Sequence, residues 1–185
     1  MDKKLFSFVY NMAFRDATLR NAFKRNQEER DIEFHKRKDR IKLYAEDYVK
    51  NYIVQIYADQ YPDPYEPIKN ICAKCKDDHF TFGNAQKLVN MSAKYMFLST
   101  YGDIEKRKKF KNCHCPMDTI MINVVKRNDK SFKCSIGWSK MELSENDIPV
   151  LYKDFQAKVK ALCDKEKEPC FPIEYDYLYW DSEEA

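Results

Sequence analysis

The sequence has little glycine, no long apolar run and no export signal. Only three of its 185 residues are glycine, and a chain so poor in this turn-forming residue favours helices over strands joined by tight turns. No stretch stays apolar over the roughly 20 residues that a membrane-spanning helix needs. The N-terminus lacks an apolar segment ending in a small-residue cleavage site. We therefore expect a cytoplasmic protein without a membrane partner.

The chain also lacks a strong excess of one charge. The net charge is +3, which by itself does not indicate a nucleic-acid partner. Hydrophobic residues make up 44% of the sequence, enough for a chain of this length to bury a core in one domain. We expect an all-α, compact, monomeric helical bundle over 1–185, divided into N-terminal helices (1–60), a Pro-rich loop (61–80), a core with the candidate site (81–180) and an acidic tail (181–185).

The seven cysteines form no regular framework. Without an export signal we expect them to be reduced thiols. The Cys72-x-x-Cys75 pair, together with Cys113 and Cys115, leaves a structural zinc site open, because a C-x-x-C pair with a second pair is a common zinc motif. The second pair, however, is C-x-C and the spacer is long. We predict no metal and no organic cofactor.

Apolar residues at helical spacing predict the main elements. The pattern indicates helices at 3–26 and 39–59, and it leaves 26–38 open as either continuous helix or an exposed elbow. Three prolines then predict a loop at 60–80 that carries a short helical turn. Further along, the sequence predicts two helices between 81 and 125, an irregular segment at 130–141, a helix at 147–166 and a short helix at 172–180.

Two predicted helix starts lie in the stretch from Thr81 to Val125. Asn84 can cap the first helix, whose predicted buried stripe is Leu88, Met91, Ser92, Tyr95 and Met96. Lys87, Asn90 and Lys94 share a different face, three and four residues apart. In the second helix Pro116 suits the first helical position, which puts Asp118 in the first turn.

A lysine and an aspartate at helix starts can carry chemistry. Near position N3 the helix dipole disfavours a cation at Lys87, and an amine kept partly neutral can form a Schiff base. A carboxylate at Asp118 can stabilise an oxocarbenium ion or activate a nucleophile. The plainer alternatives are an exposed lysine whose ammonium reaches water and an aspartate that only stabilises a helix start.

The order of these residues resembles that of helix-hairpin-helix DNA glycosylases, and most nearly the archaeal 8-oxoguanine DNA glycosylase/lyase type. The resemblance covers 80–180 and implies that Lys87 is the Schiff-base nucleophile, Asp118 the catalytic carboxylate and Asp176 a supporting acid in the pocket wall. The motifs that carry it are Phe82-Gly-Asn-Ala-Gln-Lys87 with Lys94 seven residues later, Cys115-Pro-Met-Asp118, Trp138, and Pro172-Ile-Glu-Tyr-Asp176 with Trp180 four residues later.

Such an enzyme must flip a base out of the duplex into a pocket. We expect the substrate to be a damaged base, or a modified base in invading phage DNA. Indole rings suit the pocket wall, polar side chains suit the base edge, and basic side chains suit the phosphates. The expected base-binding residues are Gln86, Asn90, His114, Trp138 and Trp180, and the expected DNA-binding residues are Lys94, Lys106, Arg107, Lys108, Lys109 and Lys140.

Two other functions stay open. Arg30-Asp-Ile-Glu-Phe-His35 resembles the arginine-to-histidine motif of HEPN ribonucleases, which implies an RNA-cleaving toxin acting through Arg30 and His35. Alternatively, the charged and aromatic surface serves a non-enzymatic phage or mobile-element protein that binds a host or defence partner.

Overall fold

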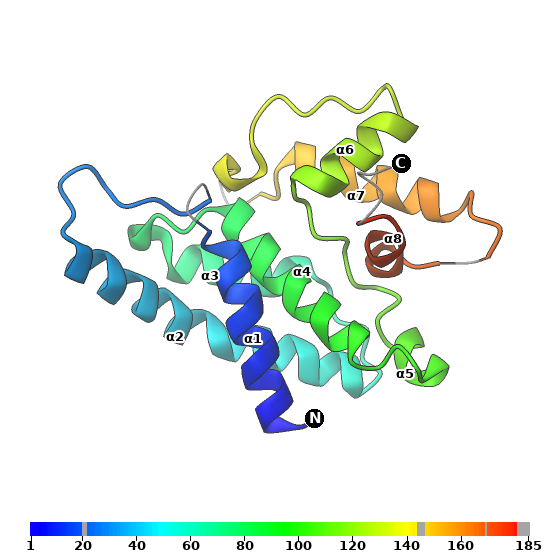
Figure 1. Cartoon of the computed structure of the whole chain (residues 1–185), viewed down its shortest axis with the longest axis horizontal. Coiled ribbons are helices and arrows are strands. Elements are labelled where there is room, and N and C mark those ends of the chain that lie inside the picture. The colour runs from blue at the N-terminus through cyan, green and yellow to red at the C-terminus, as the bar shows by residue number, and fades with distance from the viewer. Residues whose placement is uncertain (20–21, 144–146, 169, 181–185) are drawn as a thin grey trace.

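A computed structural model of the chain describes residues 1–19, 22–143, 147–168 and 170–180 (Figure 1). Helices joined by loops make up this part of the chain, which confirms the all-α prediction. The helices are α1 (Lys3–Ala17), α2 (Asp31–Tyr57), α3 (Tyr65–Lys74), α4 (Phe82–Leu98), α5 (Ile104–Lys108), α6 (Thr119–Asn128), α7 (Val150–Cys163) and α8 (Pro172–Tyr179), with 3-10 turns η1 (Lys76–Asp78) and η2 (Trp138–Lys140).

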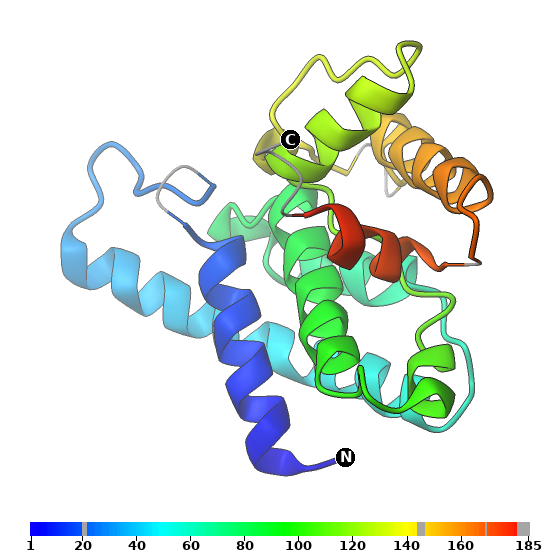
Figure 2. The same ribbon diagram turned by 45° about the vertical axis from the view of Figure 1, so that its right-hand side comes forward.

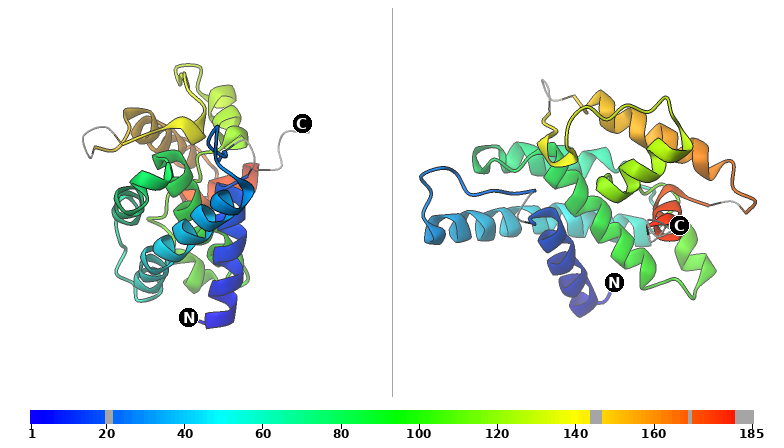
Figure 3. Two further views of the ribbon diagram at one scale, coloured as in Figure 1. Left: turned by 90° about the vertical axis from the view of Figure 1, so that its left-hand side faces the viewer. Right: turned by 45° about the horizontal axis from the view of Figure 1, so that its top comes forward.

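Helix α4 runs through the centre of the molecule. Helices α1, α2, α3 and α8 and the turn η2 all contact it, and α6, α7 and α8 gather on one side of it with α1 and α2 across from them (Figures 1, 2 and 3). Every residue from Phe82 to Lys94 is buried. The prediction of one buried stripe was therefore too narrow, because neighbouring elements cover the face of Lys87, Asn90 and Lys94 as well.

The N-terminal helices differ in length from the predicted ones. Helix α1 ends at Ala17, and the hydroxyl of Thr18 donates to the carbonyl of Phe14 at 2.8 Å. Helix α2 begins at Asp31, so most of the charged link left open at 26–38 continues the second helix. Only its first residues form the elbow.

Arg37 explains why this elbow is ordered. Its guanidinium is buried, lies 2.7 Å from Glu29 and donates to the carbonyls of Lys24 and Asp78. It also lies 4.5 Å from the centroid of the Phe23 ring. A buried arginine needs such partners to offset the loss of water, and these partners join the elbow to α2 and η1.

The predicted loop at 60–80 contains a ten-residue helix, α3. Pro64 is its N-cap residue and Pro67 lies in its first turn. The missing proline N–H groups cost nothing there, because the first N–H groups of a helix have no intrahelical partner. Ile68 and Ile71 are fully buried. The prolines therefore begin a helix that packs on α4, whereas the sequence predicts that they interrupt helical structure.

Both helix starts of the central stretch lie in a different register from the predicted one. Thr81, not Asn84, is the N-cap of α4: its hydroxyl accepts from the Asn84 N–H at 3.0 Å, and Asn84 Oδ1 accepts from the Thr81 N–H at 3.3 Å. Asp118, not a residue before it, caps α6, with Oδ1 accepting from the Met121 N–H at 3.0 Å. Each helix begins at a residue whose side chain accepts a hydrogen bond from a free N–H group of the first turn. The side chain of Pro116 offers no such acceptor.

The C-terminal helices follow the prediction more closely. Helix α8 begins at Pro172, as expected, while α7 is shorter at both ends than the predicted 147–166. The segment 130–141 is irregular apart from η2, again as expected. The predicted acidic tail at 181–185 lies outside the described residues. In the described part of the chain, no helix combines the length and the apolar character that a membrane span requires.

Candidate active site

Lys87 and Asp118 form a buried ion pair. The Lys87 Nζ atom lies 2.8 Å from Asp118 Oδ2, and the two side chains are 10% and 9% exposed. Asp118 uses its other oxygen, Oδ1, to cap α6, so the cap fixes the direction in which Oδ2 points. The start of α6 therefore presents a carboxylate oxygen to the face of α4 that carries the lysine.

The setting of Lys87 differs from the expected one in one respect. Asn84 occupies position N3 of α4, so Lys87 lies almost one turn further along the helix. The helix dipole acts mainly within the first turn. The expected effect of the helix dipole therefore does not apply to Lys87, whose amine lies in a buried contact with the Asp118 carboxylate.

The turn η2 covers Lys87. The Lys87 Nζ atom lies 5.0 Å from the centroid of the Trp138 ring, within cation–π distance. The Thr81 hydroxyl donates to the Ser139 carbonyl at 2.9 Å, and the Gly83 N–H donates to the Met141 carbonyl at 3.1 Å. Both bonds hold η2 against the start of α4.

Gly83 makes this close approach feasible. A Cβ atom at position 83 would lie 1.9 Å from the carbonyl oxygen of Trp138 and 2.8 Å from its carbonyl carbon. No side chain fits into that space without moving backbone. The single glycine before Lys87 thus serves the packing that places Trp138 over the amine.

A second ion pair of the same kind lies further along α4. The Lys94 Nζ atom is 2.6 Å from Asp176 Oδ2 on α8, and the side chains are 6% and 1% exposed. The Trp180 ring centroid lies 5.1 Å from Lys94 Nζ. Since Lys87 and Lys94 are two helical turns apart, one face of α4 carries two lysines, each beside an aspartate and a tryptophan.

The two pairs influence each other electrostatically. Burial raises the pKa of Asp176 to about 6, Lys94 opposes this, and Asp118 and Lys87 act on the same carboxyl in opposite directions. Asp176 Oδ1 has no hydrogen-bond partner within the described ranges. A fully buried carboxylate oxygen without a donor is costly, which agrees with the raised pKa of this carboxyl.

Three predicted base-reading residues bind other parts of the protein. Gln86 exchanges two hydrogen bonds with the backbone of Met117, at 2.8 and 3.1 Å. Asn90 Nδ2 donates to Gln86 Oε1 at 3.1 Å and to the Tyr152 hydroxyl at 2.7 Å, which lies 3.1 Å from His114 Nδ1. These side chains hold the segment before Asp118 against α4. Their contact with a base stays a prediction.

His114 lies at the end of this hydrogen-bonded chain and is neutral. Burial lowers its pKa to about 3. It lines a 780 Å³ cavity together with Tyr65 and Gln156, whereas neither Lys87 nor Asp118 lines that cavity. The largest hollow among the described cavities therefore does not open onto the ion pair.

Sequence reasoning missed Tyr152 and Gln156 on α7. The Gln156 amide accepts from the Cys115 N–H at 3.1 Å and donates to the Cys115 carbonyl at 2.8 Å, which fixes the chain three residues before Asp118. A glutamine on the apolar face of a predicted helix was the available signal, because buried polar side chains require partners.

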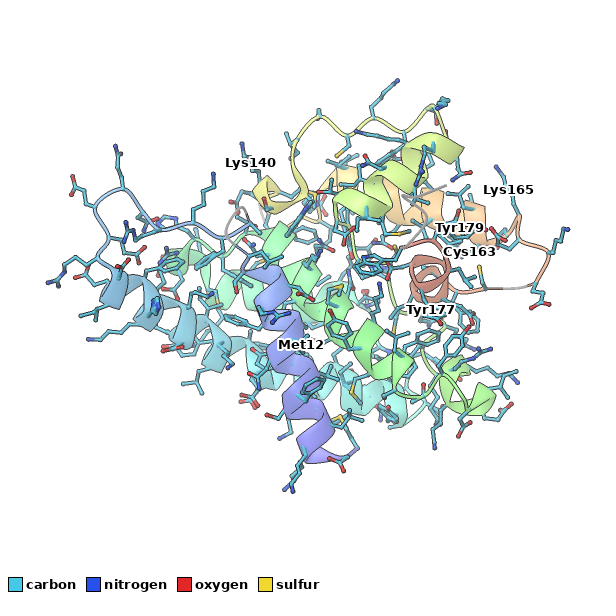
Figure 4. All side chains as sticks on the ribbon, in the orientation of Figure 1. Met12, Lys140, Cys163, Lys165, Tyr177 and Tyr179 are labelled. Carbon is cyan, nitrogen blue, oxygen red and sulfur yellow. The ribbon has the colours of Figure 1, made fainter. Side chains whose placement is uncertain are left out.

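The predicted basic DNA-binding run is neutralised by neighbouring acids. Each of its four cations lies within ion-pair distance of a carboxylate: Lys106 with Asp103, Arg107 with Glu174, Lys108 with Glu105 and Lys109 with Asp59. Lys94 is buried in its pair with Asp176. Of the predicted phosphate-binding residues, Lys140 on η2 is exposed (Figure 4).

The cysteines and the Arg30–His35 motif do not come together as sites in the described part of the chain. There, His, Cys, Asp and Glu side chains form no group of three or more that suits a metal ion. The Arg30 guanidinium is exposed and paired with Glu33 at 2.5 Å, and His35 is exposed and contacts the Phe34 ring.

No protein-family model matches the chain, and no curated protein and no solved structure matches it significantly. The geometry of α4, α6, α8 and η2 therefore bears on function. It brings together an amine in contact with a carboxylate, a second buried lysine–aspartate pair and two indole rings.

Proposed function

We propose that this protein is a DNA glycosylase with an associated AP-lyase step, built on a helix-hairpin-helix glycosylase-like fold. Its substrate would be a damaged base or a modified base, including modified bases in phage DNA. The observation that carries the proposal is the 2.8 Å contact between Lys87 Nζ and Asp118 Oδ2. These residues are far apart in sequence, and the resemblance to DNA glycosylases assigns them as nucleophile and catalytic carboxylate.

The pair supports the following chemistry. Asp118 accepts a proton from the Lys87 ammonium, and the neutral amine attacks C1′ of the deoxyribose. As the N–C1′ bond forms, the glycosidic bond breaks and its electron pair leaves with the base, which takes up the proton that Asp118 holds. Asp118 is then a carboxylate again and stabilises the positive charge that develops on the sugar. The nitrogen on C1′ loses a proton, the C1′–O4′ bond breaks with O4′ taking up a proton, and a Schiff base results. Loss of a C2′ proton then expels the 3′ phosphate by β-elimination.

The second pair supplies groups for recognising a base. Asp176 Oδ1 is an acceptor without a partner in the described structure, and Lys94 next to it is a donor. Trp180 is 48% exposed, so one of its faces is free for stacking on a flipped base. An acceptor, a donor and a planar ring together match the edge and face of a purine or pyrimidine.

A base reaches Lys87 only if a covering group moves. The Lys87 and Asp118 side chains are nearly buried, and Trp138 lies over the amine on a turn of only three residues. Displacement of η2 would expose the amine and open space for a base. Such closing segments are common where a reactive group must be kept from water.

Borohydride trapping tests this proposal. Duplexes that each carry one lesion (8-oxoguanine, uracil, a methylated base or an abasic site) are incubated with the protein and borohydride, which reduces a Schiff base to a stable adduct. We expect a covalent adduct with the wild type and its loss in Lys87→Ala. The matched control is Lys153→Ala, since Lys153 is an exposed lysine on α7 and its removal should leave the adduct yield unchanged. Absence of any adduct, or equal yield from Lys87→Ala, would refute the proposal.

A further inference from the structure

Basic side chains gather at the end of α6 and on the loop after it. Two hollows of 430 and 490 Å³ adjoin there and share Lys126 and Lys130. The first is lined by Asn123, Lys126, Arg127 and Lys130, and the second by Lys126, Lys130, Phe132, Lys133, Cys134 and Ser135. We call Lys126, Lys130 and Lys133 the α6 basic surface.

The three lysines of this surface lack carboxylate partners in the described part of the chain: no carboxylate there lies within ion-pair distance of Lys126, Lys130 or Lys133. The nearest acid in sequence, Asp129, accepts from Lys158 and Ser131 instead, which lowers its pKa. The negative end of the α6 dipole favours Lys126, but that reason does not extend to Lys130 and Lys133 in the loop.

The contrast with the 106–109 run decides which basic segment suits a polyanion. Each cation of that run already has a carboxylate partner. Binding a phosphate there would require an ion pair to be broken or shared, which reduces the net gain. Within the described residues, Lys126, Lys130 and Lys133 have no such competitor, so these lysines suit the replacement of the counterions of a nucleic acid.

The surface belongs to the same segment as the candidate active site. Asp118 caps the start of α6, and Trp138 follows the loop at its other end. That loop runs back beside α6 along the outer edge of the molecule (Figures 1 and 2). Helix α6 has ten residues, so the basic surface lies about 15 Å from Asp118 at 1.5 Å per residue. At 3.4 Å per nucleotide step this equals about four base pairs.

We propose that the α6 basic surface binds the phosphate backbone of duplex DNA about four base pairs from the nucleotide that enters the active site. The inference rests on the proposed function, because it takes DNA as the substrate. It also predicts that a duplex ending fewer than about four base pairs from the lesion on one side binds more weakly than a longer one.

Salt-dependent DNA binding tests the proposal. The affinity for a fluorescent, lesion-free duplex is measured by anisotropy at several salt concentrations for the wild type, for Lys126→Ala/Lys130→Ala/Lys133→Ala and for the matched control Lys106→Ala/Lys108→Ala/Lys109→Ala. Both triple variants remove the same charge. Three lost phosphate contacts should reduce the slope of log affinity against log salt by about 2.7 in the first variant. In the control the slope should change by less than about 0.9, the value for a single phosphate contact.

The outcomes separate this proposal from the chemistry. If the first variant keeps the wild-type slope, or the slope of the control falls by more, the proposal for the α6 basic surface is wrong. The glycosylase proposal is then unaffected. If the slope falls as expected but borohydride traps no adduct, the surface stands and the glycosylase proposal fails. A wild-type protein that binds no duplex DNA overturns both. Circular dichroism of each variant checks that the substitutions leave the helical fold unchanged.

Discussion

Two lysines seven residues apart on α4 experience nearly the same surroundings. Lys87 and Lys94 are each buried, each within 3 Å of an aspartate and each beside a tryptophan ring. Their partners differ: Asp118 Oδ1 is used by a helix cap, whereas Asp176 Oδ1 has no donor in the described structure. The helix cap therefore fixes the geometry of the Lys87–Asp118 pair, whereas the Lys94–Asp176 pair can accept one more hydrogen bond.

The raised pKa of Asp176 makes stability depend on pH in a defined window. The carboxyl has a pKa of about 6 in the folded protein against 3.8 as its ordinary value. Between these values the native state binds more proton than the unfolded state, so stability falls as pH rises. Above pH 6 the full penalty, roughly 3 kcal/mol at 1.36 kcal/mol per unit, is present.

We therefore predict how Asp176→Asn behaves. Its free energy of unfolding, measured with urea between pH 4 and pH 7, should lack the fall that the wild type shows across this window. Asp147→Asn is the control, because Lys153 lowers the pKa of the exposed Asp147 carboxyl. That variant should keep the wild-type fall. A wild-type curve parallel to that of Asp176→Asn would contradict the prediction.

At the scale of residues, the sequence indicated Lys87, Asp118, Asp176 and both tryptophans as a set, and the structure brings them together around α4. It did not indicate Tyr152 or Gln156, which hold the segment before Asp118. Pairwise contacts between distant residues leave no periodic pattern in a single sequence. Only residue types that suit a known chemistry could be singled out.

At the scale of elements, the approach of η2 to the start of α4 depends on Gly83. We predict that Gly83→Ala lowers the stability by about 1–3 kcal/mol, the usual cost of overpacking, and reduces the yield of any trapped adduct by moving Trp138 from Lys87. Unfolding in urea and borohydride trapping measure the two effects. Gly102→Ala is the matched control, since a Cβ atom there meets nothing within 4 Å. Equal effects of both substitutions would count against this role.

The helix starts show where sequence reasoning about elements reaches its limit. Thr81 and Asp118 cap α4 and α6, although Asn84 and Pro116 satisfy the same preferences at the sequence level. Several residue types can begin a helix, and neighbouring candidates differ by about 1 kcal/mol or less. Packing of the helix that follows then selects among them. Packing likewise explains why the prolines at the start of α3 begin a helix, although the sequence predicts a loop there.

At the scale of the whole molecule, all seven cysteines are free thiols, and no group of side chains in the described part of the chain suits a metal ion. We predict that a chelator and a reductant, added singly or together, leave the thermal unfolding midpoint unchanged. Differential scanning fluorimetry with and without each reagent checks this. A drop in the midpoint with the chelator alone would instead support the zinc hypothesis for Cys72, Cys75, Cys113 and Cys115.

The sequence by itself determined the helical class, the approximate positions of most helices and the identity of the charged residues on α4. These follow from periodicity and composition, which are local and survive in any single chain. The tertiary structure alone decided that α4 is buried on all sides from Phe82 to Lys94 and that Asp118 meets Lys87 and Asp176 meets Lys94. It also decided that acids pair with the 106–109 run, whereas Lys126, Lys130 and Lys133 have no carboxylate partner among the described residues. Such contacts depend on how several helices pack at once, and burial then fixes the strength of every charge among them.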